Sequence, residues 1–183
     1  MVLIGLVVSC DGRDRAKKSN TEVLKEHKLL DSFSENIRHF PEEYTETITD
    51  TLLSNGYKIR IKNFTDMRNS YLDEFEQDSI LYKHYYRDSK AKISVANDKV
   101  VFDKLIDKAF FLNFDSSLTD FFIEANLDGV WLNEEKTLSN SKITIDVVFC
   151  KPESDICEFF NLMIDDKGEY YIVNVTDEEE KDV

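Results

Sequence analysis

Short turns between runs of alternating apolar and polar residues constrain the fold of this chain most. The clearest case is residues 91–102, where two such runs flank Asn97 and Asp98. A two-residue loop there puts apolar side chains on one face and an opposite-charge pair on the other, which makes the register self-consistent. The pairs predicted by this register are Val95 with Val100, Ile93 with Phe102, and Lys92 with Asp103. The segment is therefore predicted to be a β-hairpin.

The segment before residue 57 fits two structures. Four apolar residues recur at helical spacing: Phe40, Tyr44, Ile48 and Leu52. Threonine, however, occupies every second position from 45 to 51, and β-branched residues favour strands. We favour the strand because Asn55-Gly56 leads into an alternating run at 57–62, the pattern of a tight hairpin. A two-residue loop would place Leu52 opposite Ile59.

Similar signals predict the remaining elements. Gly168 suits the positive φ of a turn at 165–168, and Gly129 follows a segment that a serine can cap as a helix. Further strands are predicted at 80–86, 130–133, 143–150, 156–164 and 169–176, and helices at 21–34 and 116–126. The predicted fold is mainly β, built from antiparallel hairpins in a sandwich-like or α+β arrangement, with one or two short helices.

The start of the chain resembles a site of lipoprotein processing. An apolar run at 2–8 is followed by the small residue Ser9 and by Cys10, which would carry the lipid. Neither Lys nor Arg precedes Cys10, and the alternative is a buried N-terminal strand. We favour lipidation because residues 11–20 are polar, as in a tether between a membrane and a domain.

These segments give a domain organisation. Residues 1–10 are predicted as a lipoprotein signal remnant, 11–40 as a polar tether with a short helix, 41–176 as a β-rich globular domain, and 177–183 as an acidic tail. No apolar run approaches the roughly 20 residues of a membrane-spanning helix, so attachment would depend on the lipid.

Charge limits the choice of partner. The formal net charge of −14 argues against nucleic acid, because phosphate binding needs a basic surface. The acidity fits either the solubility of an exposed domain or a basic protein partner.

Motifs of enzyme chemistry are scarce. His27, His39 and His84 form no metal-ligand spacing, and the five glycines form no phosphate loop. An abundance of carboxylates does not define a catalytic pair without geometry. We therefore expect no cofactor and no metal ion, and favour a non-enzymatic protein. Cys150 and Cys157 flank a short connection and are predicted either as a disulfide or as two buried thiols.

One aromatic segment is a candidate binding surface. Tyr82, Tyr85, Tyr86 and Arg87 could stack on a sugar or a peptide. The alternative is a strand whose aromatic side chains pack on one face and lie exposed on the other.

Several motifs together carry a family resemblance. They are residues 50–57, the segment 82–88, the hairpin 92–111, residues 152–155 and the Asp-Lys-Gly turn at 166–168. In this order they resemble uncharacterised lipoproteins of the Bacteroidota type, over residues 44–176 together with Cys10. The resemblance implies a lipid-anchored envelope protein, and it brings no functional residues because the family has no assigned activity.

The sequence thus predicts a membrane-anchored protein of the cell envelope, periplasmic or at the cell surface, that binds a protein or a glycan. The alternative is an acidic immunity or inhibitor protein that neutralises a basic effector. A weaker third hypothesis is a hydrolase whose site forms only in the folded chain.

Overall fold

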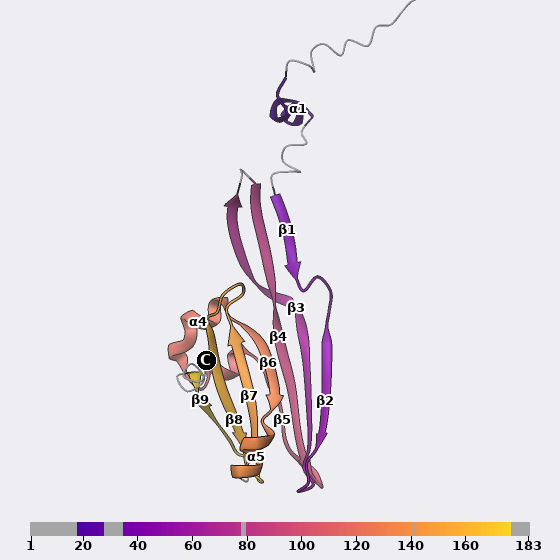
Figure 1. Ribbon diagram of the computed structural model, residues 1–183, viewed down its shortest axis with the longest axis vertical. Coiled ribbons are helices and arrows are strands. Elements are labelled where there is room, and N and C mark those ends of the chain that lie inside the picture. Colours follow the sequence, from indigo (N-terminus) through magenta and orange to yellow (C-terminus); the bar gives the residue numbers. More distant parts are fainter. Residues whose placement is uncertain (1–17, 28–34, 78–79, 141, 177–183) are drawn as a thin grey trace, which may run out of the picture. The chain divides into compact units, whose positions relative to one another are not determined.

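The computed structural model describes residues 18–27, 35–77, 80–140 and 142–176 (Figure 1). Its elements are mainly β-strands in two sheets, joined by short helices. The mainly β fold predicted from the turns is confirmed. By contacts the chain divides into two compact units, one of Met1–Ile37 with Glu74–Lys83 and one of Arg38–Asp73 with His84–Val183.

The first sheet has the order β1-β4-β3-β2, and β5 also pairs with β4. Its strands are β1 (Glu35–Phe40), β2 (Glu46–Leu52), β3 (Lys58–Gln77), β4 (Ile80–Asn97) and β5 (Lys99–Ile106). β3 and β4 contain 20 and 18 residues, whereas strands usually contain about 5–6. The two long strands therefore contribute residues to both compact units.

The second sheet lies within the second unit and has the order β6-β7-β8-β9. Its strands, all antiparallel to their neighbours, are β6 (Asn126–Leu132), β7 (Ile143–Cys150), β8 (Cys157–Ile164) and β9 (Tyr170–Asn174). The helices of this unit are α3 (Lys108–Leu112), η2 (Ser116–Leu118), α4 (Thr119–Glu124) and α5 (Glu134–Asn140).

The core of the second unit lies between the inner faces of the two sheets. Ile93 and Val95 of β4 belong to the same buried cluster as Ile145 and Val147 of β7. Phe111 of α3 is fully buried in it, and its ring centroid lies 4.7 Å from that of Phe160 and 5.1 Å from that of Phe149. On β4 the buried residues Ala91, Ile93 and Val95 alternate along the strand, as the period-two pattern predicts, whereas β7 buries residues on both of its faces.

The first predicted hairpin forms, but its register differs by one residue. Leu52 pairs with Lys58 rather than with Ile59, because the loop has one residue more than predicted. Gly56, at φ 90°, supplies the left-handed conformation that this longer loop requires. Ile59 thereby stays in the core, while Leu52 is 69% exposed.

The second predicted hairpin also forms, with a β-bulge between Val95 and Ala96. Val95 therefore pairs with Phe102 instead of Val100, and Val100 is exposed. The predicted pairing of Ile93 with Phe102 is likewise wrong. An added residue in one strand shifts every pair beyond it, which periodicity alone cannot reveal.

Other elements differ in extent from the prediction. α1 (Asn20–Glu26) begins one residue before the helix predicted at 21–34, and residues 28–34 lie outside the described residues. β1 is a strand within the segment 11–40, which we predicted as a tether with a helix. α3 and α5 are short helices that the pattern did not indicate. In the described part of the chain, no helix is long and apolar enough to span a membrane.

Candidate functional site

The predicted site residues fall in different parts of the chain. Cys10, with the predicted lipid, lies outside the described residues. Cys150 and Cys157 pair directly across β7 and β8, and a disulfide joins their sulfur atoms. The disulfide closes the turn between the two strands, where Lys151 N–H donates to the Ile156 carbonyl at 2.9 Å.

The residues of the predicted aromatic surface contact different partners within each compact unit. In the first unit, Tyr82 stacks on Phe75 with 5.0 Å between the ring centroids. In the second unit, Tyr85 stacks on His39, with the centroids 4.9 Å apart. Tyr86 is the next residue of the same strand and therefore projects from the opposite face.

Tyr86 and Arg87 are committed to contacts inside the second unit. The Tyr86 hydroxyl donates to Glu153 at 2.6 Å, and burial together with this hydrogen bond raises the pKa of the hydroxyl above its usual range. The Arg87 guanidinium donates to the carbonyls of Pro41 at 3.0 Å and Met67 at 3.1 Å. A groove of about 540 Å³ runs beside these contacts. The polar side chains of Tyr86, Arg87 and Glu153, which line this groove, are therefore engaged in contacts that hold the fold together.

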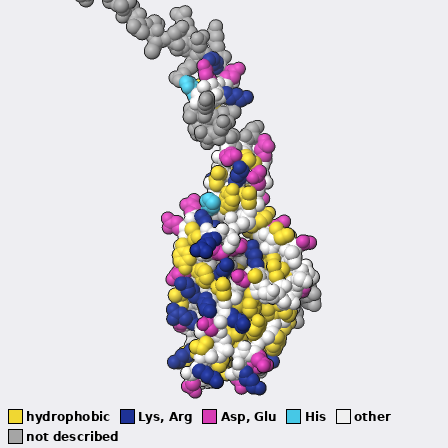
Figure 2. Space-filling view, turned by 180° about the vertical axis from the view of Figure 1, so that it is seen from behind, with side chains coloured by type: hydrophobic (Ala, Val, Ile, Leu, Met, Phe, Trp, Pro, Cys, Tyr) yellow, Lys and Arg dark blue, Asp and Glu magenta, His cyan; other side chains and the backbone are white. Residues whose placement is uncertain are grey.

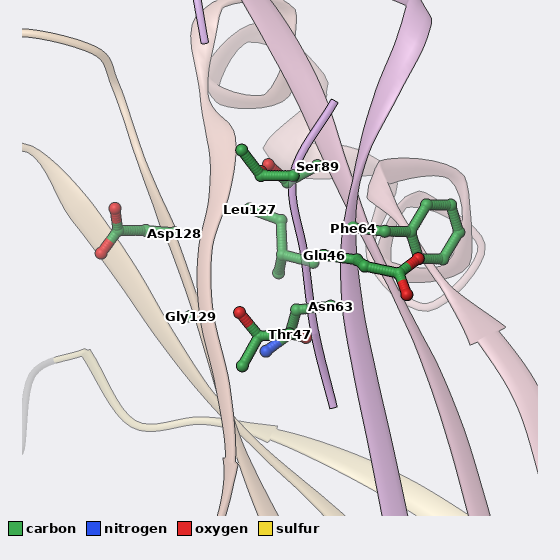
Figure 3. Close-up of a pocket in the computed structure, with 9 residues that line it drawn as sticks. Glu46, Thr47, Asn63, Phe64, Ser89, Leu127, Asp128 and Gly129 are labelled. Carbon is green, nitrogen blue, oxygen red and sulfur yellow. The ribbon is translucent and has the colours of Figure 1, made fainter. Parts of the chain in front are cut away.

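A smaller pocket of about 100 Å³ lies between the edge of β6 and strands β2 and β3 (Figure 3). Leu127, Asn63 and Thr47 occupy its centre, while the carboxylates of Glu46 and Asp128 point away from one another. The Asn63 amide donates to the Val130 carbonyl at 3.3 Å. This pocket therefore brings no pair of carboxyl groups together for acid–base chemistry.

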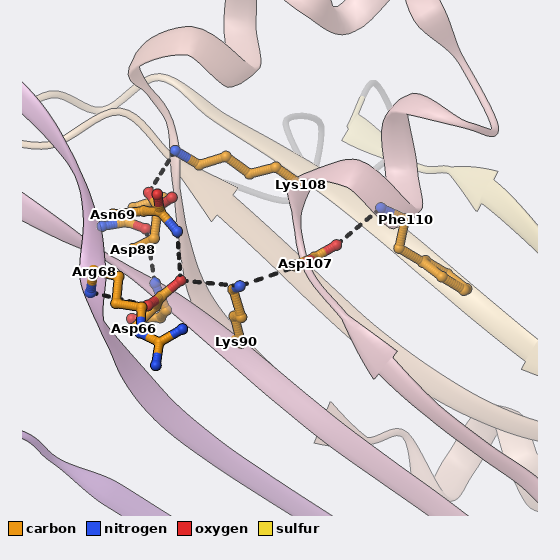
Figure 4. A network of polar contacts seen from close by, with 10 residues as sticks. Asp66, Arg68, Asn69, Asp88, Lys90, Asp107, Lys108 and Phe110 are labelled. Atoms are coloured by element: carbon orange, nitrogen blue, oxygen red, sulfur yellow. Dashed lines mark hydrogen bonds and ion pairs between the residues drawn. The ribbon is translucent and has the colours of Figure 1, made fainter.

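An ion network connects β3 and β4 with the start of α3 (Figure 4). The Lys90 ammonium lies 2.9 Å from Asp66 and 3.9 Å from Asp107, and the Lys108 ammonium lies 2.6 Å from Asp88. Asp107 also caps α3 by accepting from a backbone N–H. Each of these lysine and aspartate side chains lies within 4 Å of an opposite charge, so we assign the network to stability.

The electrostatics of Asp66 support this assignment. Burial raises the pKa of its carboxyl, but hydrogen bonds from Asn69, Lys90 and the Arg68 N–H outweigh burial and lower the pKa to about 2. The carboxyl is therefore ionised throughout the physiological range and is not a proton donor.

Several other charges on the first sheet form cross-strand ion pairs. The face in Figure 2 shows Lys and Arg side chains interspersed with Asp and Glu. Cross-strand ion pairs on this sheet join Lys62 to Glu46 at 2.7 Å, Arg60 to Asp50 at 3.7 Å, and Lys92 to Asp103. Exposed pairs of this kind contribute about 0–1 kcal/mol each.

The outer face of the second sheet is different, because it carries an aromatic ring beside a polar cluster. We call it the Trp131 shelf, and define it by Trp131, Asp146, Val148, Phe159, Asn161 and Val175. These residues line a hollow of about 70 Å³. Trp131 pairs with Asp146 across β6 and β7, and Asp146 pairs with Asn161 across β7 and β8. The register therefore sets an indole, a carboxylate and an amide in one row.

Glycine sets the position of the indole. A Cβ atom at Gly129 would lie 2.4 Å from Cζ3 of Trp131, so the ring leans over the glycine backbone. Trp131 is nevertheless 47% exposed, whereas Val148, the cross-strand partner of Gly129, is buried. One side of the indole thus rests on the sheet while the rest remains accessible.

Hydrogen bonds fix the polar cluster of the shelf. The Asp146 carboxylate accepts from Asn161 Nδ2 at 2.7 Å and from Asn133 Nδ2 at 2.8 Å. Asn161, only 7% exposed, accepts from the Lys136 ammonium at 3.0 Å. Asn133 also accepts from the Lys136 N–H at the start of α5, which places the helix beside the shelf. The carboxylate is thereby held as a hydrogen-bond acceptor.

The sequence prediction missed the shelf. A signal was nevertheless present, because Asp146 and Asn161 each interrupt an otherwise apolar run. Gly129 and Trp131, two residues apart on a strand, also share a face. Neither signal shows that the two polar residues are cross-strand partners.

Comparison with known proteins adds no functional assignment. A scan against protein-family models and a search of curated proteins each found no match to this chain. Among the described residues, no group of three His, Cys, Asp or Glu side chains could hold a metal ion. The candidate site therefore rests on the geometry of the shelf.

Proposed function

We propose that this protein is a non-enzymatic binding domain of the cell envelope, held at the membrane by a lipid on Cys10. One observation carries the binding role: the half-exposed Trp131 ring lies beside the fixed pair of Asp146 and Asn161. Ligand sites typically combine apolar or aromatic surface with a few precisely placed polar groups. The ligand is a protein or a glycan of the periplasm or the cell surface.

The composition of the shelf supports binding over hydrolysis. Hydrolysis by carboxyl groups usually needs two of them, on either side of the reacting bond. Among its defining residues the shelf has a single carboxyl group, that of Asp146, and its neighbour is the amide of Asn161. An acceptor beside an amide suits recognition of a ligand's polar groups.

Two features support a location in the envelope. The apolar run at 2–8 followed by Ser9 and Cys10 fits lipoprotein processing, and several acyl chains on one cysteine give stable attachment. The disulfide between Cys150 and Cys157 fits an oxidising compartment outside the cytosol.

Metabolic labelling with an alkyne analogue of palmitate tests the anchor. We expect the wild-type chain to take up the label and to fractionate with membranes, and the Cys10→Ala variant to do neither. The double variant Cys150→Ser and Cys157→Ser is the control, because it lacks the other cysteines and should keep the label. Equal labelling of Cys10→Ala and the wild type would contradict the anchor.

Photocrosslinking tests the binding role without assuming a ligand class. Val173 pairs with Asn161 across β8 and β9, next to the shelf. A benzophenone amino acid at this position should crosslink to an envelope component in intact cells, and the product should disappear when Trp131→Ala is added. A crosslink that survives Trp131→Ala would contradict the role of the shelf.

A further inference from the structure

We infer that the ligand of the Trp131 shelf is a carbohydrate, and that the shelf seats one neutral sugar ring. This inference rests on the proposed binding function and narrows it to one chemical class. Its elements are an indole that offers an apolar surface, a carboxylate in the neighbouring cross-strand position, and a balance of charge around that carboxylate.

The indole provides the apolar half of the interaction. Sugar rings present C–H groups on their faces, and these pack on the electron-rich face of an aromatic ring. Trp131 is 47% exposed, and its orientation depends on the missing side chain at Gly129. A ring that is already fixed loses little conformational entropy when a ligand stacks on it.

The carboxylate provides the polar half. An ionised carboxylate has about four acceptor positions, and Asp146 uses one at each oxygen for Asn133 and Asn161. The remaining positions can accept from the hydroxyl groups of a sugar. Directly paired residues have Cβ atoms about 5 Å apart, and Trp131 pairs directly with Asp146. A sugar ring on the indole would therefore carry its hydroxyls to the carboxylate.

The surrounding charge favours a neutral sugar over an acidic one. Asp146 bears the negative charge of the cluster, and the Lys136 ammonium is connected to it through Asn161, 3.0 Å from the Asn161 oxygen. Within this hydrogen-bonded cluster of described residues, the Lys136 ammonium thus balances the Asp146 carboxylate. A sugar acid would bring a second negative charge close to Asp146, where repulsion opposes binding.

The dimensions of the hollow favour a unit within a longer glycan. Its volume of about 70 Å³ seats only part of a sugar ring. The remainder of the ring, with its linkages to neighbouring units, would stay in solvent. Such shallow sites bind weakly, and we expect dissociation constants of about 0.1–1 mM, which correspond to binding free energies of about −5.5 to −4.1 kcal/mol.

The single tryptophan makes the test specific for this site. Trp131 is the only tryptophan of the chain, so emission excited at 295 nm reports on the shelf. The full chain carrying Cys10→Ala, which receives no lipid, is titrated with xylan, mannan, laminarin, dextran and galactan, and with polygalacturonate as the acidic comparator. We expect at least one neutral glycan to shift the emission, and polygalacturonate to leave it unchanged.

Variants assign the effect to the shelf. By affinity electrophoresis in the responding glycan, Trp131→Ala should abolish retardation and Asp146→Asn should weaken binding about tenfold. Tyr44→Ala is the matched control, because Tyr44 is 48% exposed and lies outside the shelf, and it should bind like the parent. Thermal unfolding of each variant shows whether it is folded.

Three results would overturn the inference: no neutral glycan in the panel shifts the emission, only polygalacturonate does so, or folded Trp131→Ala binds like the parent. Neither palmitate labelling nor the crosslink at position 173 presupposes that the ligand is a sugar. If both succeed while all the glycans fail, the carbohydrate inference is wrong and the proposed function stands.

Discussion

Replacing Asp66 by asparagine should destabilise the protein in a way that depends on pH. The carboxylate accepts from Asn69 at 2.8 Å and lies 2.9 Å from the Lys90 ammonium. Asparagine keeps the size of the side chain but removes its charge. Of its two ion pairs among the described residues, Lys90 would retain the more distant one, with Asp107 3.9 Å away.

The magnitude follows from the pKa of Asp66, which folding lowers from 3.8 to about 2. Such a change corresponds to about 2 kcal/mol of unfolding free energy at neutral pH. Solvent screening near the surface reduces this, and we expect a loss of about 1–2 kcal/mol for Asp66→Asn at pH 7.

The dependence on pH has a definite sign. Because the folded pKa lies below the unfolded one, the contribution is complete above the unfolded value and disappears as the pH falls through the folded value. The difference between wild type and Asp66→Asn should therefore be constant from pH 7 to about 5. It should shrink between about pH 4 and 2.

Urea unfolding followed by circular dichroism, without reductant, measures both quantities across this range. Asp103→Asn is the control, since Asp103 has 50% side-chain exposure and pairs with Lys92; its effect should stay below about 1 kcal/mol. A loss below about 0.5 kcal/mol at pH 7, or a difference that persists unchanged at the lowest pH, would refute the assignment of Asp66 to stability.

Further substitutions test the core, a turn and the shelf. Phe111→Ala should cost about 3–5 kcal/mol in urea unfolding, because Phe111 is fully buried, whereas Phe114→Ala at an exposed position should cost less than about 1 kcal/mol. Gly168→Ala should lower stability by more than about 1 kcal/mol, because Gly168 has φ 82° and an added Cβ would lie 1.9 Å from a backbone oxygen. Gly129→Ala should displace the Trp131 ring, which a shift in emission wavelength would show, while unchanged emission would contradict the close packing.

Local sequence signals were sufficient for the hairpins but not for their registers. Asn55-Gly56 and Asn97-Asp98 mark turns because short polar residues and glycine tolerate left-handed backbone. The longer loop at Gly56 and the bulge after Val95 depend on how the strands then pack, which no local pattern encodes.

The length of strand β3 was also underestimated from the sequence. β3 continues to Gln77, well past the alternating run that predicted a strand at 57–62. Beyond that run its residues are largely exposed, so the contrast between apolar and polar positions fades. Strand pairing with β4 holds the segment in place, which is a tertiary effect.

The polar pair of the Trp131 shelf, Asp146 and Asn161, allows a stricter test of whether the shelf serves binding or stability. Asn161 is buried and Asp146 is half-buried. A hydrogen-bonded polar pair of this kind contributes little net stability, and replacing both partners by apolar residues of similar shape is often neutral or stabilising. The double variant with Asp146→Val and Asn161→Val should therefore unfold within about 1 kcal/mol of the wild type, since Asn133 and Lys136 are partly exposed and can turn to water.

The single variant Asp146→Val should have an unfolding free energy about 1–3 kcal/mol lower than that of the double variant, because the nearly buried Asn161 amide would lose its acceptor. Urea unfolding of the wild type, the two single variants and the double variant completes a double-mutant cycle for this pair. If the double variant loses as much unfolding free energy as the less stable single variant, the role of the pair is to stabilise the fold. If it retains stability, the fold does not require Asp146 and Asn161, and their position beside an exposed indole is explained by what the shelf binds.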